Sequence, residues 1–231
     1  MKTFDVIIVG GGVVGAAIAR ELSQYKLSVA LFEKEIELAF GVSKSNSGII
    51  HPGTQNSPDS LKGKLCVEGN RLTRDLAGDL GVDFKQVGEL IVAFNDDDVQ
   101  RLEKIKEDAD KLGVPDLKIV NRKWLREKEP NLSPKVVAAL YAPTAGIISP
   151  YRWVYDLSEN AAENGVEIFT SKKVEKIVAP HVNHSEYFTV TAGGITDRAR
   201  YIVNAAGLFA DDIARMVGIT DFCISPRKGE E

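Results

Sequence analysis

The stretch FDVIIVGGGVVG, Phe4–Gly15, decides the fold of this chain. Phe4–Val9 is a short apolar run, as expected for a strand that is buried on both faces. The glycines that follow supply the pattern G-x-G-x-x-G, and Ala16–Tyr25 carries apolar residues at helical spacing. A strand, a glycine-rich loop and a helix in this order predict the start of a nucleotide-binding βαβ unit.

Each glycine of the pattern has a separate physical role. Gly10 allows a tight turn, and Gly12 lets the backbone approach a pyrophosphate. Gly15 lets the helix pack close to the strand. The N-terminus of the helix attracts the negative charge of the phosphates.

An acidic residue completes the unit. Ser28–Phe32 is a second apolar strand, and Glu33 ends it eighteen residues after Gly15. A carboxylate at this place can accept hydrogen bonds from a ribose diol, and it would repel a 2′-phosphate. The sequence therefore predicts a bound adenine dinucleotide without a 2′-phosphate. The alternative is a glycine-rich turn of an α/β protein that holds no ligand.

Composition excludes several classes of protein. The chain has 231 residues, 44% hydrophobic and 27% charged, which is ordinary for a globular protein of one or two domains. Its net charge of -4 argues against nucleic acid as a partner. No apolar run approaches the roughly 18 residues of a transmembrane helix, and the N-terminus lacks the features of a secretory signal.

Cysteine and histidine usage favours a reducing compartment without a metal site. Cys66 and Cys223 are isolated from each other and from any histidine cluster, so we expect neither a disulfide framework nor a metal. We expect a cytoplasmic location, either free or peripheral to a membrane. His181 and His184 fall in a polar turn, and we interpret both as structural.

The rest of the chain alternates helices and strands. A polar, glycine-bearing stretch, 41–60, is long for a connection, which favours a functional loop. After it we expect a helix over 61–80, a strand pair within 81–94, a charged amphipathic helix over 96–112, a short strand and helix within 117–132, and a strand over 136–141. A helix over 149–164 and a third parallel strand over 166–170 should follow. The last expected elements are a meander of 174–178, 187–191 and 195–200, and a buried strand over 201–205.

Four segments identify a family. They are SKSNSGIIHPG (Ser43–Gly53), SPDSLK (Ser57–Lys62), NAAG (Asn204–Gly207) and PRKGE (Pro226–Glu230). Together with the N-terminal unit they resemble the D-amino-acid-oxidase-like FAD oxidoreductases. Within this superfamily the chain is most similar to the FAD-dependent glycerol-3-phosphate dehydrogenases and L-2-hydroxyglutarate oxidases. The resemblance covers essentially the whole chain.

The resemblance implies an α/β fold with FAD as the cofactor. An FAD-binding Rossmann-like (βαβ) domain, 1–80 and 150–217, would carry an inserted, incomplete α+β substrate domain, 81–149 and 218–231. The resemblance implies cofactor-binding roles for Gly10, Gly12 and Gly15 at the pyrophosphate, Glu33 at the adenosine ribose, Ser43, Asn46, Ser47, Gly48 and Ile49 along the flavin side, Val174 at the adenine, and Ala206 and Gly207 beneath the cofactor. It also implies that Val13, Val14 and Lys34 bind the cofactor.

The resemblance also gives candidates for the chemistry. His51 would lie near the flavin ring, where a histidine can act as a base, bind substrate, orient the ring or attach covalently to the flavin, as in some relatives. A purely structural histidine is the alternative. Arg227 is a candidate for binding the substrate's carboxylate or phosphate, and Lys62 and Lys64 are others, with a surface role as the alternative.

Two functions remain open from the sequence. The first is an FAD-dependent dehydrogenase or oxidase that oxidises a small hydroxy acid or a polyol phosphate such as glycerol 3-phosphate. It would pass electrons to a protein acceptor or a quinone. The second is an FAD-binding fragment or subunit without catalysis of its own, because family members run well past this length and the segment 226–230 normally opens a strand inside their substrate domain. That reading implies a partner chain or self-association. An NAD-dependent dehydrogenase is disfavoured because the segment 41–53 matches flavin-binding loops.

Overall fold

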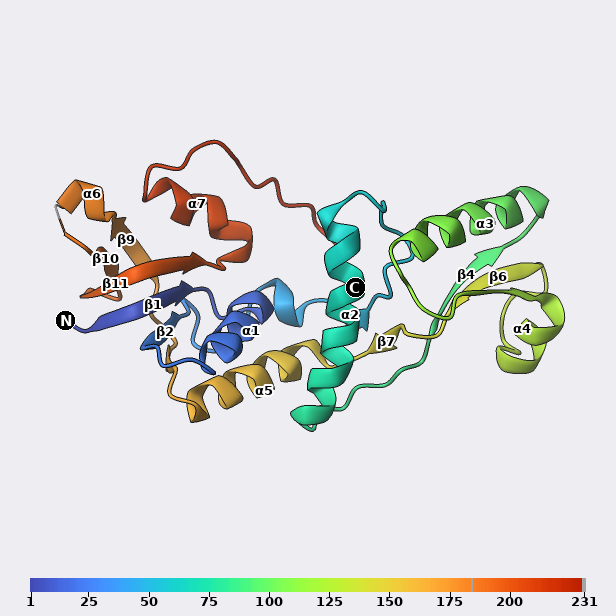
Figure 1. The fold of residues 1–231 in the computed structure, drawn as a ribbon, viewed down its shortest axis with the longest axis horizontal. Helices are drawn as coiled ribbons and strands as arrows, with labels where there is room; N and C mark the ends of the chain where they lie inside the picture. The colour runs from blue at the N-terminus through green and yellow to red at the C-terminus, as the bar shows by residue number, and fades with distance from the viewer. Residues whose placement is uncertain (184, 230–231) are drawn as a thin grey trace. The chain divides into compact units, whose positions relative to one another are not determined.

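The chain forms two compact units. The structure is a computed structural model that describes residues 1–183 and 185–229, so His184 and Glu230 lie outside the described residues. The first unit comprises Met1–Ser47 and Pro150–Glu231, and the second comprises Gly48–Ser149. Figure 1 labels most of their helices and strands.

A twisted six-stranded sheet is the centre of the first unit. Its order is β8-β2-β1-β11-β10-β9, formed by β8 (Glu167–Phe169), β2 (Val29–Phe32), β1 (Thr3–Val9), β11 (Ile195–Asn204), β10 (Phe188–Ala192) and β9 (Val174–Val178). The strands β8, β2, β1 and β11 run parallel, whereas β10 and β9 are antiparallel to their neighbours. The helix α1 (Val13–Leu22) connects β1 to β2, which confirms the predicted βαβ unit. It begins three residues earlier than the apolar spacing predicts.

The strand β11 changes partner along its length. The sequence predicts two separate strands, 195–200 and 201–205, and this is wrong, because one continuous strand covers Ile195–Asn204. Its first half pairs antiparallel with β10 and its second half pairs parallel with β1, so that Ala199 lies opposite both Phe188 and Phe4. Tyr201 is exposed, so this part of the strand is not buried as predicted.

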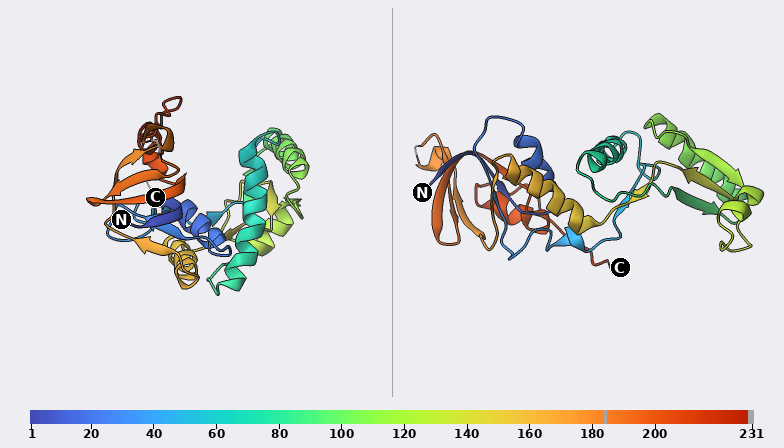
Figure 2. Two further views of the ribbon diagram at one scale, coloured as in Figure 1. Left: turned by 60° about the vertical axis from the view of Figure 1, so that its left-hand side comes forward. Right: turned by 90° about the horizontal axis from the view of Figure 1, so that it is seen from below.

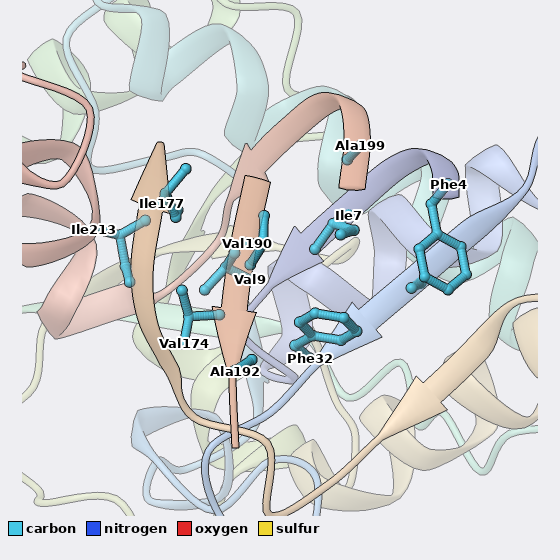
Figure 3. Close-up of a cluster of buried hydrophobic side chains, with 11 residues drawn as sticks. Phe4, Ile7, Val9, Phe32, Val174, Ile177, Val190, Ala192, Ala199 and Ile213 are labelled. Carbon is cyan, nitrogen blue, oxygen red and sulfur yellow. The ribbon is translucent and has the colours of Figure 1, made fainter. Parts of the chain in front are cut away.

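The core of this unit lies between the parallel strands and the meander. Side chains from β1, β2, β9, β10, β11 and α7 (Ala210–Arg215) meet there, as Figure 3 shows: Phe4, Ile7, Val9, Phe32, Val174, Ile177, Val190, Ala192, Ala199 and Ile213. A second contact joins α1 to α5 (Pro150–Glu163), which lie side by side (Figures 1 and 2). The buried Ala16 and Ala19 of α1 let the two helices approach closely.

The second unit is built around a three-stranded antiparallel sheet. Its order is β4-β6-β5, with β4 (Glu89–Ala93), β6 (Ala138–Ala142) and β5 (Lys118–Asn121). The helix α3 (Asp96–Lys111) packs its apolar stripe on this sheet, and α4 (Arg122–Lys128) follows β5. The segment 81–94, all of which the structure describes, contains the single strand β4 and not the predicted pair. The partner of β4 comes from β6, far along the chain.

The helix α2 (Leu61–Asp79) packs through its small and polar residues. Its buried residues are Gly63, Asn70 and Ala77, whereas Leu61, Leu65 and Leu72 of the predicted apolar face are exposed. Ser60 caps the helix, since its Oγ accepts the Gly63 N–H at 3.0 Å. Nearby, β3 (Ile49–Ile50) pairs with β7 (Gly146–Ile147).

The boundaries of the two compact units differ from the domain boundaries that the family resemblance implies. Residues 48–80 pack with the second unit rather than with the nucleotide-binding part, and the C-terminal segment packs with the first unit. Asn70 explains the first difference, because its side chain donates to the carbonyls of His51 at 3.2 Å and Thr144 at 3.0 Å. In the described part of the chain, no helix combines the length and the apolar character that crossing a membrane requires.

Candidate functional site

The glycine-rich loop after β1 has no room for side chains at two positions. Gly10 has φ +112°, and a Cβ there would lie 2.4 Å from the carbonyl oxygen of Ala205. A Cβ on Gly15 would lie 1.9 Å from the carbonyl oxygen of Gly10. Gly10 is therefore required by the tight turn, and Gly15 is required by the close packing of α1 against the loop. Both agree with the roles expected of these glycines.

The N-terminus of α1 opens beside the loop. Gly12 is the N-cap, and the Ser43 Oγ accepts the N–H of Val13 at 2.9 Å. The first turn contains no acidic residue, so its partial positive charge is not compensated from within the helix. Such a helix end favours an anionic ligand.

A cavity of about 830 Å³ lies in the first unit and includes this helix end. Its volume is near the upper limit of the roughly 300–1,000 Å³ that is usual for small-molecule and cofactor sites. Ten residues expected at the cofactor line it: Gly10, Gly12, Val13, Val14, Glu33, Lys34, Ser43, Val174, Ala206 and Gly207. The structure thus brings together four segments of the chain: 10–14, 33–43, Val174 and 206–207.

The other five expected cofactor residues do not line this cavity. Gly15 is buried behind the loop, and its role is packing. Asn46 and Ser47 belong to the first unit, and the Asn46 Nδ2 donates to the carbonyls of Val42 at 3.1 Å and Ser43 at 2.9 Å. Gly48 and Ile49 belong to the second unit.

Glu33 holds the loop through its carboxylate. The residue is only 8% exposed. Its Oε2 accepts the N–H of Gly11 at 2.6 Å, and its Oε1 accepts the N–H of Glu35 at 2.9 Å. A carboxylate offers about four acceptor positions, so it retains capacity for the hydroxyls of a ribose. The volume of the cavity, the N-terminus of α1 and the acceptor capacity of Glu33 therefore fit a dinucleotide.

One wall of the cavity has no counterpart in the sequence motifs. Lys172 lines it, and the Lys172 Nζ lies 2.9 Å from the Asp197 Oδ2, with the two side chains 12% and 5% exposed. The same ammonium group lies 4.2 Å from the centroid of the Phe32 ring. Burial raises the pKa of Asp197, but the hydrogen bond from the Lys2 N–H and the charge of Lys172 outweigh it, so this pKa lies below its usual value. The wall also includes Leu208, Phe209 and Met216.

The expected catalytic histidine lies in the second unit. The His51 Nδ1 is 3.1 Å from the Glu89 Oε2, and the Thr54 Oγ1 donates to the Glu89 Oε1 at 2.9 Å. The Cys66 thiol donates to the His51 carbonyl at 3.6 Å, and burial raises the pKa of this thiol.

The candidates for binding a substrate anion are all exposed. Arg227 lies in a C-terminal segment without helix or strand, and Lys62 and Lys64 lie on α2. Among residues 1–183 and 185–229, no group of three or more histidine, cysteine, aspartate and glutamate side chains could hold a metal ion.

Comparison with known proteins decides the family. The family model described as "FAD dependent oxidoreductase" (DAO) matches residues 5–230. The chain belongs to this family. FAD is therefore the cofactor that membership of the DAO family assigns to it.

Curated relatives lie in the two groups that the sequence suggests. The glycerol 3-phosphate dehydrogenase of Caloramator mitchellensis is 44% identical over 227 residues, which is 98% of this chain and 46% of that protein. The mitochondrial L-2-hydroxyglutarate dehydrogenase of Homo sapiens is 34% identical over 240 residues, which is 99% of this chain and 51% of that protein. The chain thus spans about half the length of the curated relatives it matches.

A solved structure shares the fold. The L-α-glycerophosphate oxidase of Mycoplasma pneumoniae, solved with FAD bound, matches with a TM-score of 0.87 and 33% sequence identity. The match covers 94% of this chain and 57% of that one. This likeness confirms the α/β fold of a DAO-family FAD-binding protein.

Proposed function

We propose that this DAO-family chain carries the FAD-binding site of a dehydrogenase or oxidase that oxidises a small hydroxy acid or glycerol 3-phosphate. The observation that supports this most strongly is the cavity of about 830 Å³, in which the glycine-rich loop, the start of α1 and Glu33 come together. The substrate class follows from the names of the matched relatives, which act on glycerol 3-phosphate and L-2-hydroxyglutarate.

Different residues of the cavity would bind different parts of the cofactor. The backbone of Gly10 to Gly12 and the N-terminus of α1 would hold the pyrophosphate, since both offer N–H groups and a partial positive charge. Glu33 would accept hydrogen bonds from the adenosine ribose. Val174 would lie at the adenine, and Ala206 and Gly207 would let the cofactor pass close to the backbone.

The second unit would contribute to the chemistry through His51. FAD, when bound, supplies the acceptor for a hydride from the carbinol carbon. The Nε2 of His51 would accept the proton of the substrate hydroxyl, because its Nδ1 is already engaged by Glu89. Arg227 stays the candidate for holding the substrate's carboxylate or phosphate.

The proposal also includes an electron acceptor and a cellular location. A protein or a quinone would reoxidise the flavin, and we retain a partner chain or self-association as part of the same proposal. The two free cysteines, Cys66 and Cys223, are compatible with a reducing cytoplasm, free or at a membrane surface.

The decisive experiment adds each substrate to the FAD-loaded chain. Glycerol 3-phosphate or L-2-hydroxyglutarate should bleach the visible absorbance of the flavin under anaerobic conditions. Addition of an artificial acceptor should then restore it. Bound FAD that neither compound bleaches would favour the second function, an FAD-binding module that another chain completes. A chain that binds no FAD would contradict both.

A further inference from the structure

His51 and Glu89 form a pair whose geometry is defined on both sides. The His51 side chain is 57% exposed, whereas the Glu89 side chain is 17% exposed. One oxygen of Glu89 faces the His51 Nδ1 at 3.1 Å, and the other accepts the Thr54 hydroxyl at 2.9 Å. Because each carboxylate oxygen has its own partner, the plane of the carboxylate is fixed.

The contact has a consequence for the proton of the imidazole. An ionised carboxylate only accepts hydrogen bonds, and a neutral imidazole carries one N–H. The 3.1 Å contact is therefore a hydrogen bond only when the proton is on Nδ1. The Nε2 then has a free lone pair, and a free lone pair is what a general base needs.

The backbone on either side of the pair is also held in place. Glu89 is the first residue of β4 and lies opposite Ala142 of β6. The His51 carbonyl accepts the buried Asn70 side-chain amide at 3.2 Å, and the same amide donates to the Thr144 carbonyl at 3.0 Å. All of these residues lie within the second unit, so the geometry is internal to one compact body.

We infer that Glu89 is a positioning residue that sets the tautomer and the orientation of His51. It keeps the proton on Nδ1 and presents Nε2 as the acceptor, with Thr54 fixing the carboxylate. The catalytic value of this arrangement rests on the proposed function of His51, but the tautomer itself does not. The Cys66 thiol of α2 also faces the pair, since it donates to the His51 carbonyl at 3.6 Å and the charge of Glu89 helps to raise its pKa.

NMR of the whole chain with ¹⁵N-labelled histidine tests the tautomer directly. His51 is assigned by the signal that disappears in His51→Asn. In the neutral state, the wild-type His51 should carry its proton on Nδ1. In Glu89→Ala this preference should be lost, with the proton moving to Nε2, as in a free imidazole. Glu89→Gln should retain the Nδ1 form, because the amide oxygen still accepts the hydrogen bond.

Glu68→Ala provides the matched control. Glu68 is an exposed glutamate in the same unit, paired with Arg71 at 2.7 Å, and its loss should leave the His51 tautomer unchanged. A wild-type His51 protonated on Nε2 would overturn the inference. The same tautomer in wild type and in Glu89→Ala would also overturn it. If Glu89→Ala does not fold, the tautomer of Glu89→Gln is compared with the wild type, and a proton on Nε2 in that variant would also overturn the inference.

Kinetics separate this inference from the proposed function. If His51 is the base, Glu89→Ala should lower kcat on the order of 10- to 100-fold, by analogy with the loss of the outer partner of a metal-ligating histidine, with KM little changed. Glu89→Gln should recover most of this loss. A changed tautomer with unchanged kcat would support the role of Glu89 and contradict the role of His51 as the base.

Discussion

Replacing Gly15 by alanine tests the glycine-rich loop most severely. The added Cβ would lie 1.9 Å from the Gly10 carbonyl oxygen, whereas real Cβ atoms do not approach other atoms closer than 3.0 Å. The obstacle is backbone, and the N–H of Gly10 is itself bonded to the Phe32 carbonyl at 2.8 Å. Either α1 or the loop must therefore move by about 1 Å.

The expected magnitude follows from the cost of overpacking. Extra atoms in a well-packed site usually cost about 1–3 kcal/mol, which is a large part of the roughly 5–15 kcal/mol that stabilises a protein. A shift of the loop also removes the N–H groups from the pyrophosphate. We therefore expect FAD affinity to fall at least tenfold, which corresponds to about 1.4 kcal/mol.

Gly69→Ala is the matched control for this measurement. Gly69 is in the interior of α2, and a Cβ there would meet no atom within 4 Å. In such a position, alanine stabilises by about 0.4–1 kcal/mol, so the two variants should differ by about 1.5–4 kcal/mol in the free energy of unfolding. Urea denaturation followed by circular dichroism, and titration of the apoprotein with FAD, measure the two effects. Equal stability and normal FAD affinity in both variants would refute the packing argument.

Two further changes probe the walls of the cavity. Glu33→Gln loses the charge and replaces one of the two oxygens that accept backbone N–H groups by a donor, so FAD affinity should fall at least tenfold. An unchanged dissociation constant would mean that neither the loop nor a ribose depends on this carboxylate. Asp197→Ala leaves the nearly buried Lys172 without its carboxylate and should cost about 3 kcal/mol, against less than about 0.5 kcal/mol for the exposed Asp221→Ala. Because the pKa of Asp197 is lowered by folding, its contribution should be complete above about pH 4 and disappear as the pH falls further, and urea titrations at pH 7 and pH 3 check this. A cost that stays constant over this range would contradict the ion pair.

Local signals were sufficient for the nucleotide-binding unit. The apolar run of β1, the glycines after it and Glu33 each have a direct physical role, and the structure has β1, α1 and β2 in the predicted order. The ends of two other helices were also predictable, because each is marked by a residue with a local physical role. Asn95 caps α3 by accepting the N–H of Asp98 at 2.9 Å, and Gly165, at φ +95°, follows the end of α5.

Predictions failed where distant pairing decides. No local pattern shows that β4 pairs with β6, or that β11 exchanges β10 for β1 near Ala199. The face that α2 buries was also missed, because Asn70 packs inward by hydrogen bonding to carbonyls, which hydrophobic periodicity does not detect.

The residues of the candidate site also fall into those that local motifs identify and those that only the three-dimensional fold brings together. Positions in a motif, such as Gly10 and Ser43, could be found from the sequence. Lys172 and Phe209 could not, because Lys172 lies in the connection between β8 and β9 and Phe209 in the turn after β11, outside every motif of the sequence. The pair of His51 and Glu89 is 38 residues apart, and no spacing rule connects them.

The most direct test is to extract the pigment of the natively purified chain. The cavity of the first unit and the DAO-family match predict one FAD per chain, released on denaturation, or retained on the protein if a histidine carries it covalently. Gly15→Ala should purify with less flavin than Gly69→Ala. A stoichiometric nicotinamide dinucleotide with no flavin, or a wild-type chain that neither contains FAD nor binds it when supplied, would contradict the account.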